Sequence, residues 1–213
     1  MKISHVRIPD EVKHVAETLE TAGFEAYLVG GCVRDLLRET APKDWDLTTN
    51  AHPDDIQSLF PDHYANNDFG TIGVKTESED TTLHIIEVTP YRSESGYSDL
   101  RRPDTVTFGV SLEEDLARRD FTVNALAYSI KDQNIVDLYE GIDDLKAKRL
   151  KTVGDPHERF NEDALRMMRA VRFAAQLGFV IDGATMTAIT EHAELLKKIA
   201  IERIARSEER RVG

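Results

Sequence analysis

The sequence has little of what marks secreted or membrane proteins. It contains one cysteine, Cys32, which cannot form an internal disulfide, and it has no run of about 18 apolar residues that could cross a membrane. Its first residues, MKISHVRIPDEV, lack the apolar core of a signal peptide. These absences favour a cytoplasmic protein that does not enter a membrane.

Motifs of several common site classes are also missing. Neither GxGxxG nor GxxxxGK occurs, which excludes the usual dinucleotide-binding and P-loop sites. The seven histidines form no HExxH or HxH pair, so we interpret them as structural or surface residues, and the single cysteine argues against a zinc site. No nucleophile elbow supports a Ser-His-Asp site.

The formal net charge of the 213-residue chain is -12, and the acidic excess is uneven. Residues 1–150 carry 16 Lys and Arg against 29 Asp and Glu, whereas residues 151–213 carry 11 against 10. A chain this acidic does not attract RNA by bulk electrostatics. Binding of a nucleic acid would require local basic groups, a bound cation or a further domain.

Hydrophobic residues make up 40% of the chain, enough for a substantial core, and their spacing predicts an α/β fold. Apolar runs or alternation predict strands at residues 27–29, 44–49, 70–76, 83–88 and 134–139. Helical spacing predicts helices at residues 9–22, 31–38, 54–60, 111–128 and 162–177. Residues 89–110 are polar without a clear period and predict a long loop, either functional or mobile.

A change of pattern near residues 139–150 predicts a domain boundary. We expect an α/β head domain over residues 1–140 and an all-helical domain over residues 141–213. No internal repeat or low-complexity tract interrupts either part.

The stretch from Tyr27 to Thr49 carries the first candidate site. Its apolar strand stops at Gly30-Gly31, where a helix carrying Arg34 begins. Two interpretations are open for the glycines. They form a tight turn between strand and helix, or they leave a bare backbone that cradles phosphate oxygens.

The same stretch ends with two carboxylates, Asp44 and Asp46, which would project from one face of a strand because side chains there repeat every two residues. The pair could be solvated carboxylates, a Mg²⁺ site, or the DxD pair of a glycosyltransferase. Glu87, late in the predicted strand HIIEV, is a candidate third carboxylate or an outward-facing strand residue. Two metal ions held here could activate an attacking hydroxyl and stabilise a leaving pyrophosphate.

The run RRDFTVNALAY, residues 118–128, falls within a predicted helix. Asp120 and Asn124 would lie four residues apart on one face, while Phe121, Ala125 and Tyr128 would line another. An ordinary surface helix with an Arg–Asp pair is one interpretation. The other is that Asp and Asn bind a sugar hydroxyl while arginine binds phosphates.

The run EDALRMMRAVRF, residues 162–173, places Asp163, Arg166 and Arg169 at a spacing of three on a predicted helix. Glu162 and Arg166 could form an ordinary ion pair across one turn. Alternatively, a carboxylate and a guanidinium on one face could hydrogen-bond the edge of a nucleobase. Met167, Met168, Val171 and Phe173 are expected core residues.

Four segments occur in the order LVGGCVRD, DWDLTT, RRDFTVNALAY and GDPHERFNEDALRMMRAVRF. Together they resemble the bacterial tRNA nucleotidyltransferase/poly(A) polymerase family, and within it most closely the CCA-adding enzymes. The resemblance covers about residues 24–205. It implies a polymerase-β-like nucleotidyltransferase head with a mixed sheet, followed by the family's helical neck.

The resemblance also implies a role for each matching position. The implied metal-binding catalytic pair is Asp44 and Asp46. The residues implied to hold the triphosphate are Gly30, Gly31 and Arg34. Those implied to bind the ribose and phosphates are Arg119, Asp120 and Asn124. The element implied to select the base, with Asp163 and Arg166 pairing with it in place of a template, comprises Glu162, Asp163 and Arg166, with Arg169 as a further candidate.

The implied activity is template-independent addition of CMP and AMP, from CTP and ATP, to the 3′ end of tRNA, with Mg²⁺ as the cofactor. A poly(A) polymerase or A-adding enzyme of the same family is the alternative; the long 89–110 segment argues modestly against a CC-only enzyme, because Tyr97–Pro103 resembles the segment associated with adding the terminal A. A non-catalytic nucleotide- or RNA-binding fragment is the alternative from another class. A DxD glycosyltransferase would give no reason for EDALR on a helix.

The end of the sequence departs from the family pattern. Members usually continue into body and tail domains that hold the tRNA, whereas this chain stops at Gly213. Residues 206–213 lose the family pattern, and we expect them to be an artificial or truncated terminus.

Overall fold

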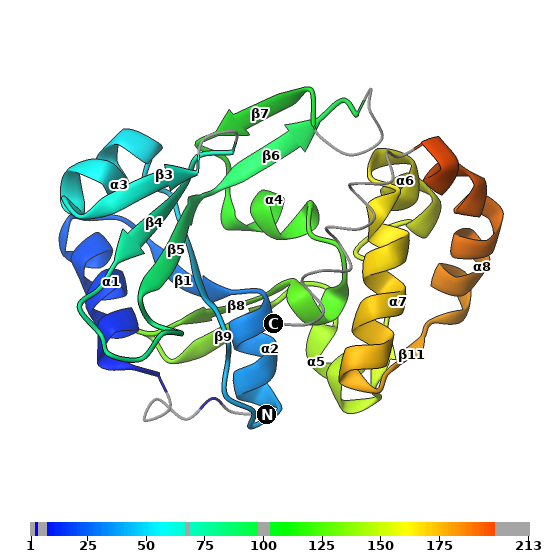
Figure 1. The fold of residues 1–213 in the computed structure, drawn as a ribbon, viewed down its shortest axis with the longest axis horizontal. Helices are drawn as coiled ribbons and strands as arrows, with labels where there is room; N and C mark the ends of the chain where they lie inside the picture. Colours follow the sequence, from blue (N-terminus) through cyan, green and yellow to red (C-terminus); the bar gives the residue numbers. More distant parts are fainter. Residues whose placement is uncertain (1–2, 4–7, 67–68, 98–102, 199–213) are drawn as a thin grey trace.

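The computed structural model describes residues 3, 8–66, 69–97 and 103–198, so the unusual terminus at 206–213 lies outside the described residues. Within these ranges a mixed sheet with helices on both faces is followed by a helical part (Figure 1). The strands of the main sheet, in spatial order, are β3 (His63–Asn66), β4 (Thr71–Lys75), β5 (Ile85–Pro90), β2 (Trp45–Thr49), β1 (Ala26–Val29), β8 (Leu126–Ser129) and β9 (Asn134–Asp137).

Neighbouring strands are antiparallel except for β2 and β5, which run parallel. The parallel register places Asp46 directly beside Glu87. Paired positions on adjacent strands point to the same face of a sheet, so two predicted site carboxylates are brought together by strand pairing alone.

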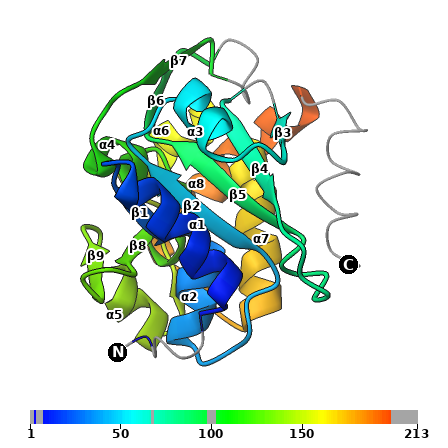
Figure 2. The ribbon, with the colours of Figure 1, turned by 90° about the vertical axis from the view of Figure 1, so that its left-hand side faces the viewer.

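Helices cover both faces of the sheet. On one face, α1 (Asp10–Thr21) packs against β1 and β2, and α3 (Pro53–Leu59) packs against β4 and β5. On the other, α2 (Gly31–Leu37) contacts β1, β2 and β8. Figure 2 shows α1 in front of the sheet and the C-terminal helices behind it. Burial of apolar side chains on all three helices stabilises this arrangement.

The predicted helix over residues 111–128 is wrong beyond its first turns. The capping box of Ser111 and Glu114 starts α4 (Leu112–Ala117) as expected. The chain then extends at Phe121, which forms an isolated bridge with Thr152, passes through the 3₁₀ turn η2 (Thr122–Asn124) and enters β8. Pairing with residues 151–153 therefore overrides the helical spacing.

The predicted long loop at residues 89–110 is also wrong over its described part. Residues Arg92–Ser95 form β6 and Thr105–Phe108 form β7, paired as an antiparallel hairpin. Within Tyr97–Pro103, the segment related to addition of the terminal A, residues 98–102 lie outside the described residues.

The C-terminal part is largely helical, but it differs from the prediction by an extra pair of short strands and by an interruption in one helix. Its helices are α5 (Gly141–Lys146), α6 (Pro156–Glu162), α7 (Leu165–Leu177), α8 (Gly183–His192) and the 3₁₀ helix η3 (Ala193–Lys198). A two-residue parallel pair, β10 (Arg149–Leu150) with β11 (Val180–Ile181), was not predicted. The predicted single helix over 162–177 is broken at Asp163, whose φ of -136° and ψ of 100° are extended; Gly178 ends α7 as expected.

The core extends from the sheet into this part, because Leu145, Leu150 and Ala170 belong to the same buried cluster as the strand residues. The division of the chain at residue 140 stays a prediction. Of the expected core residues on α7, Met167 is buried but Val171 is 52% exposed. None of the helices in the described ranges is long and apolar enough to span a membrane.

A close approach at Gly141 gives a stability prediction. A Cβ there would lie 2.3 Å from the carbonyl oxygen of Thr122, in the backbone of η2. Gly141→Ala should therefore lower the free energy of unfolding by about 1–3 kcal/mol, because backbone must move to make room. Urea unfolding measures the change. Gly183→Ala, where a Cβ meets nothing within 4 Å, is the control; equal stability of the two variants would contradict the prediction.

Candidate functional site

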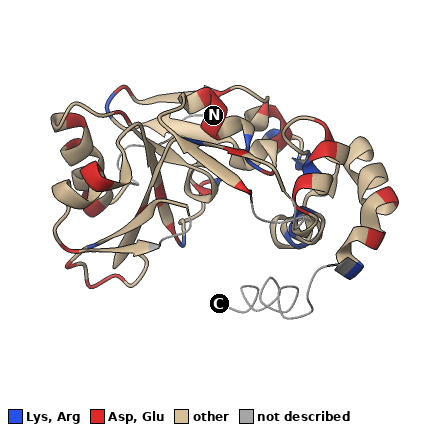
Figure 3. Cartoon of the chain, turned by 90° about the horizontal axis from the view of Figure 1, so that it is seen from above, with Lys and Arg blue, Asp and Glu red and all other residues tan. Residues whose placement is uncertain are grey.

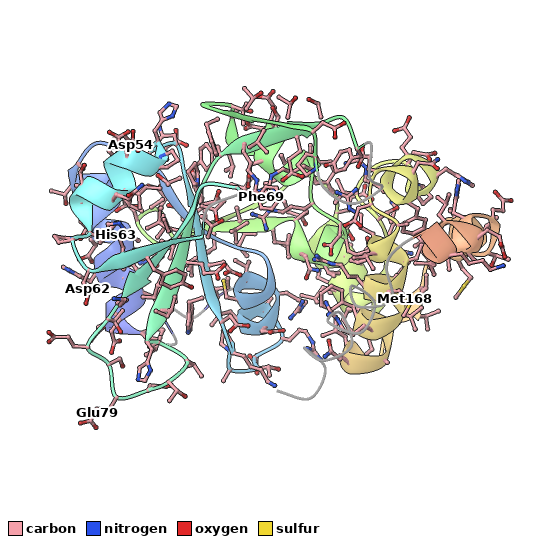
Figure 4. All side chains as sticks on the ribbon, turned by 45° about the horizontal axis from the view of Figure 1, so that its top comes forward. Asp54, Asp62, His63, Phe69, Glu79 and Met168 are labelled. Atoms are coloured by element: carbon pink, nitrogen blue, oxygen red, sulfur yellow. The ribbon has the colours of Figure 1, made fainter. Side chains whose placement is uncertain are left out.

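A cleft of about 880 Å³ lies between the head and the C-terminal helices. Its lining comes from α2, β2, the hairpin, the segment around η2, and α7. Figure 4 shows the labelled Phe69, one of its lining residues, near the middle of the molecule, whereas Asp54, Asp62, His63 and Glu79 lie at the end away from α7. The predicted site residues that line it are Gly30, Gly31, Arg34, Asp44, Asp46, Arg119, Asp120, Asn124, Asp163, Arg166 and Arg169.

The cleft is basic although the chain is acidic. Among the residues that the structure describes, nine Lys or Arg side chains line it against six Asp or Glu, whereas the whole chain has a formal charge of -12. Figure 3 shows Lys and Arg together with Asp and Glu on the C-terminal helices. The local basic groups that binding of a nucleotide or RNA would require are therefore present.

Gly30 connects β1 to α2 and lies in the wall of the cleft. Its φ of 79° favours glycine, and a Cβ there would lie 3.3 Å from Nη1 of Arg119 and 3.9 Å from Oδ2 of Asp46. The turn interpretation of Gly30-Gly31 is thus correct. Both glycines also line the cleft with backbone alone, and the phosphate interpretation stays a prediction.

The carboxylates of the predicted metal site lie at one end of the cleft. Asp44 is exposed in the bend before β2, and Asp46 is half-buried within it. Burial and the neighbouring charge of Glu87 raise the pKa of Asp46 to about 7, against an opposing effect of Arg119 and a further raising effect of Asp44. A concentration of negative charge that keeps a proton at neutral pH suits a divalent cation.

Glu87 itself does not line the cleft, and within the described ranges no three His, Cys, Asp or Glu side chains are arranged to hold a metal ion. The donor set is therefore Asp44 and Asp46, and further ligands would have to come from water and substrate. That matches the preference of Mg²⁺ for one or two carboxylates plus phosphate oxygens.

A chain of polar contacts crosses the cleft from α2 to α7. Nη1 of Arg34 donates to Oδ1 of Asn124 over 2.7 Å, and Nδ2 of Asn124 donates to Oδ1 of Asp120 over 3.3 Å. Oδ2 of Asp120 pairs with Nη2 of Arg169 at 2.5 Å. Burial alone would raise the pKa of Asp120, but Arg169 and these hydrogen bonds outweigh it and hold the pKa below its usual value. Asp120 and Asn124 do meet, although through η2 and not on a helix.

The base-selecting element takes an unexpected form. Asp163 follows the end of α6, and its Oδ1 accepts a hydrogen bond from the backbone N of Leu165 over 2.9 Å, which helps to start α7. Arg166 is 6% exposed and pairs with Glu162 at 2.7 Å. Asp163 and Arg166 line the cleft, whereas Glu162 does not. Glu162 also forms an ion pair with Arg159, which does not line the cleft either. The ordinary ion-pair interpretation is thus correct for Glu162.

Several cleft residues were missed by the sequence reasoning. Arg38 follows Arg34 by one helical turn, so helical spacing could have found it. Phe173 was expected only in the core, but Arg34, Arg169 and Arg172 lie over its ring at 5.0 to 5.9 Å from the centroid. The hairpin's contribution, Arg92 and Glu94, gave no local signal because it depends on long-range pairing.

The raised pKa of Asp46 gives a pH-dependent stability prediction. Between the ordinary pKa of 3.8 and about pH 7, Asp46 binds a proton in the folded chain but not in the unfolded chain. The free energy of unfolding therefore falls as pH rises through this range. Asp46→Asn carries no such charge. We therefore compare the unfolding free energies of Asp46→Asn and the wild type in the presence of chelator. The advantage of the variant should be larger at pH 8 than at pH 5, by on the order of 1 kcal/mol. A pH-independent difference in urea unfolding would contradict this.

Comparisons with known proteins agree with this geometry. A family model described as the poly A polymerase head domain matches residues 26–151, and one described as a probable RNA and SrmB-binding site of polymerase A matches residues 178–206. The chain is 50% identical over 212 residues to the CCA-adding enzyme of Levilactobacillus brevis and 50% identical over 202 residues to that of Lactobacillus helveticus. These matches cover 95% and 93% of this chain but 50% and 49% of the relatives, so the chain spans about half their length.

Solved structures give the same result. The Bacillus stearothermophilus CCA-adding enzyme in complex with CTP matches with a TM-score of 0.83 at 37% identity, over 95% of this chain and 48% of that chain. A tRNA nucleotidyltransferase complexed with a primer tRNA and an incoming ATP analog matches with a TM-score of 0.74 at 29% identity, over 92% and 55% of the two chains. The predicted mixed-sheet head followed by helices is confirmed, and the chain belongs to the tRNA nucleotidyltransferase/poly(A) polymerase family.

Proposed function

We propose that this chain is the catalytic portion of an enzyme that adds CMP and AMP, from CTP and ATP, to the 3′ end of tRNA. The observation that carries the proposal is convergence: residues suited to a metal, a triphosphate, a ribose and a base come from four separate segments and line one cleft. Because the chain spans about half the length of its relatives, we propose that the remainder of such a protein holds the body of the tRNA.

Asp44 and Asp46 would hold Mg²⁺, because two adjacent carboxylates offer the oxygens and negative charge that this ion prefers, and the cation would replace the proton that burial and Glu87 favour on Asp46. Bound there, Mg²⁺ would neutralise charge that develops around the α-phosphate as pyrophosphate leaves. Among the described residues, no cysteine or histidine lines the cleft apart from the buried Cys32, so a softer metal has little advantage.

The remaining cleft residues would position the nucleotide. Gly30 and Gly31 would let the triphosphate approach the backbone closely, with Arg119 beside it. Arg34 is held by both oxygens of Asp35 and by Asn124, so it would contribute charge and orient Asn124 more than grip a phosphate by itself. Fixed groups of this kind favour phosphoryl transfer, which depends mainly on positioning.

The ribose and base would be read deeper in the cleft. Asp120 and Asn124 offer an acceptor and an amide for sugar hydroxyls, with Arg169 paired to Asp120. Asp163 accepts and Arg166 donates hydrogen bonds, and this combination suits the polar edge of cytosine or adenine. Arg166 lies in the first turn of α7, a 13-residue helix, and Asp163 lies just before that helix, so a rigid support would present one reading edge to two different bases.

The proposal is tested by incubating the chain, and a protein of the relatives' full length that contains it, with tRNAs ending before CCA, after C and after CC. CTP and ATP are supplied singly and together with Mg²⁺. We expect CTP to extend the first two primers and ATP to extend the third. ATP incorporation without any CTP incorporation would favour a poly(A) or A-adding enzyme. Nucleotide binding without extension by either protein would favour a non-catalytic fragment.

A cytoplasmic location belongs to the same proposal, because CTP, ATP and tRNA are available there. The single cysteine is buried, and burial raises the pKa of the Cys32 thiol to about 12, so it is an unreactive core residue. It therefore contributes no redox chemistry to the proposed reaction.

A further inference from the structure

Asp115 is a fully buried carboxylate behind the cleft, and none of the roles proposed above uses it. It lies in α4, and its side chain is 0% exposed. Five hydrogen bonds reach its two oxygens, from Thr48 in β2, from the backbone of Arg92 in β6, and from the side chains of Arg118 and Arg119. A buried carboxylate with this many donors fixes the geometry of its partners.

The two oxygens divide the partners between the hairpin and the metal end of the cleft. Oδ1 accepts from Nε and Nη2 of Arg118 at 3.0 and 2.6 Å, and Arg118 in turn donates to the backbone oxygen of Arg92 in the hairpin. Oδ2 accepts from Nη2 of Arg119 at 3.1 Å and from the hydroxyl of Thr48 at 3.3 Å. Thr48 is two residues after Asp46 on the same strand.

The other end of the Arg119 guanidinium faces the predicted metal site. Its Nη1 lies 3.3 Å from the position of a Cβ on Gly30, and Oδ2 of Asp46 lies 3.9 Å from the same point. Arg119 therefore stands beside Asp46 while its ion pair runs to Asp115. An arginine and a divalent cation would compete for the same carboxylate oxygens of Asp46.

We propose that Asp115 is a positioning residue: its ion pair with Arg119 keeps that guanidinium from pairing with the neighbouring Asp46, so that the Asp46 carboxylate remains available to a divalent cation. The inference rests on the proposed function for its metal site. Without the negative charge at residue 115, Arg119 would pair with Asp46 instead. Asp115 would thereby set both the metal affinity and the location of a positive charge beside the triphosphate.

The test measures Mn²⁺ binding without nucleotide or tRNA, by electron paramagnetic resonance of free Mn²⁺, in the 213-residue chain. Asp115→Asn should weaken Mn²⁺ binding about tenfold, which corresponds to about 1.4 kcal/mol. Adding Asp115→Asn to Arg119→Gln should cause no further weakening, because no guanidinium is left to compete. Asp144→Asn is the matched control: Asp144 is 1% exposed and accepts hydrogen bonds from Thr122 and Arg149 at 2.6 Å, but it does not line the cleft.

The outcomes separate the inference from the function on which it rests. Unchanged Mn²⁺ affinity in Asp115→Asn, or equal weakening with and without Arg119, overturns the role of Asp115 alone. A wild-type chain that binds no Mn²⁺ overturns the metal role of Asp44 and Asp46, and the inference with it. A chain that binds Mn²⁺ as expected but adds no nucleotide overturns the proposed activity and leaves the role of Asp115 supported.

A second measurement applies if Asp115→Asn does not fold. In the wild type, nitrogen-15 spectra of the arginine guanidinium groups, with Arg119 assigned by comparison with Arg119→Gln, should show separate and slowly exchanging Nη signals for Arg119. A guanidinium pinned by Asp115 rotates slowly about its Nε–Cζ bond, whereas a free one gives a single averaged signal. An averaged signal for Arg119 would overturn the inference.

Discussion

Asp46→Asn is expected to abolish nucleotide incorporation while making the metal-free chain more stable at pH 8. The two effects have one physical origin. Asp46 is a half-buried carboxylate beside Glu87, so its charge opposes folding, yet that same charge would hold Mg²⁺ at the reacting phosphate. Removal of one metal ligand should lower kcat/KM at least about a thousandfold, or about 4 kcal/mol of transition-state stabilisation.

The opposite signs make the experiment decisive. Most inactive variants leave open whether the fold or the chemistry failed, whereas a variant that is both more stable and inactive has lost chemistry. Asp44→Asn is the companion variant: Asp44 is exposed, so its loss should reduce incorporation with little change in unfolding free energy. Incorporation assays on a tRNA ending in CC, with urea unfolding in parallel, measure both quantities. Wild-type turnover in either variant would refute the proposed metal role.

The head illustrates what a single sequence can predict. Each strand of the main sheet except β3 and β8 coincides with an expected apolar or alternating segment, and Asp44 and Asp46, two residues apart, line the same cleft. These features are local, because strand periodicity and two-residue spacing are written in consecutive residues. Glu87 illustrates the limit: its place beside Asp46 depends on β5 pairing with β2, which local pattern does not specify.

The errors have tertiary causes. Residues 118–124 have helical spacing, but Phe121 bridges Thr152 and the backbone N of Thr122 donates to the oxygen of Lys151 over 2.9 Å. These contacts with a distant segment replace helix with an extended stretch and a 3₁₀ turn. The contact of Asp120 with Asn124 survives because a 3₁₀ turn also brings residues a few positions apart together.

Asp115 depends both on a local pattern, which the sequence shows, and on tertiary packing, which it does not. Its two arginines follow at positions three and four, a spacing that on a helix already predicts contact. The sequence could not show that Asp115 is buried, because burial follows from the packing of α4 against β6 and the pairing of Thr48 with its carboxylate. A residue that would be ordinary on a surface helix becomes, once buried, a fixed support for two cleft arginines.

Arg166→Ala is expected to relax the choice between CTP and ATP more than it weakens binding of the triphosphate. Arg166 lines the cleft beside Asp163 and lies far along the chain from the glycines and Asp46 that would hold the phosphates and metal. Loss of a well-placed base contact changes discrimination by about 1–3 kcal/mol. The ratio of kcat/KM for CTP on a primer lacking CCA to that for ATP on a primer ending in CC should therefore shift about tenfold or more.

Arg166 also makes structural contacts, and a control variant must account for them. Nη1 of Arg166 donates to Glu162 over 2.7 Å and Nη2 donates to the backbone oxygen of Arg118 over 3.0 Å, so this side chain also ties α7 to the segment after α4. Its removal should lower stability as well as change selectivity. Arg159→Ala disturbs the same Glu162 carboxylate and also loses a contact to the oxygen of Ala117, but Arg159 does not line the cleft.

The two variants together distinguish a base-reading arginine from a structural one. If Arg166 reads the base, Arg166→Ala shifts the CTP-to-ATP ratio and Arg159→Ala does not, although both are less stable than the wild type. If Arg166 only braces the corner between α6 and α7, both variants lose activity towards CTP and ATP in equal proportion. Unchanged selectivity in Arg166→Ala would therefore contradict the template role, and it would shift that role to Asp163, whose Oδ1 is already engaged by the backbone of Leu165.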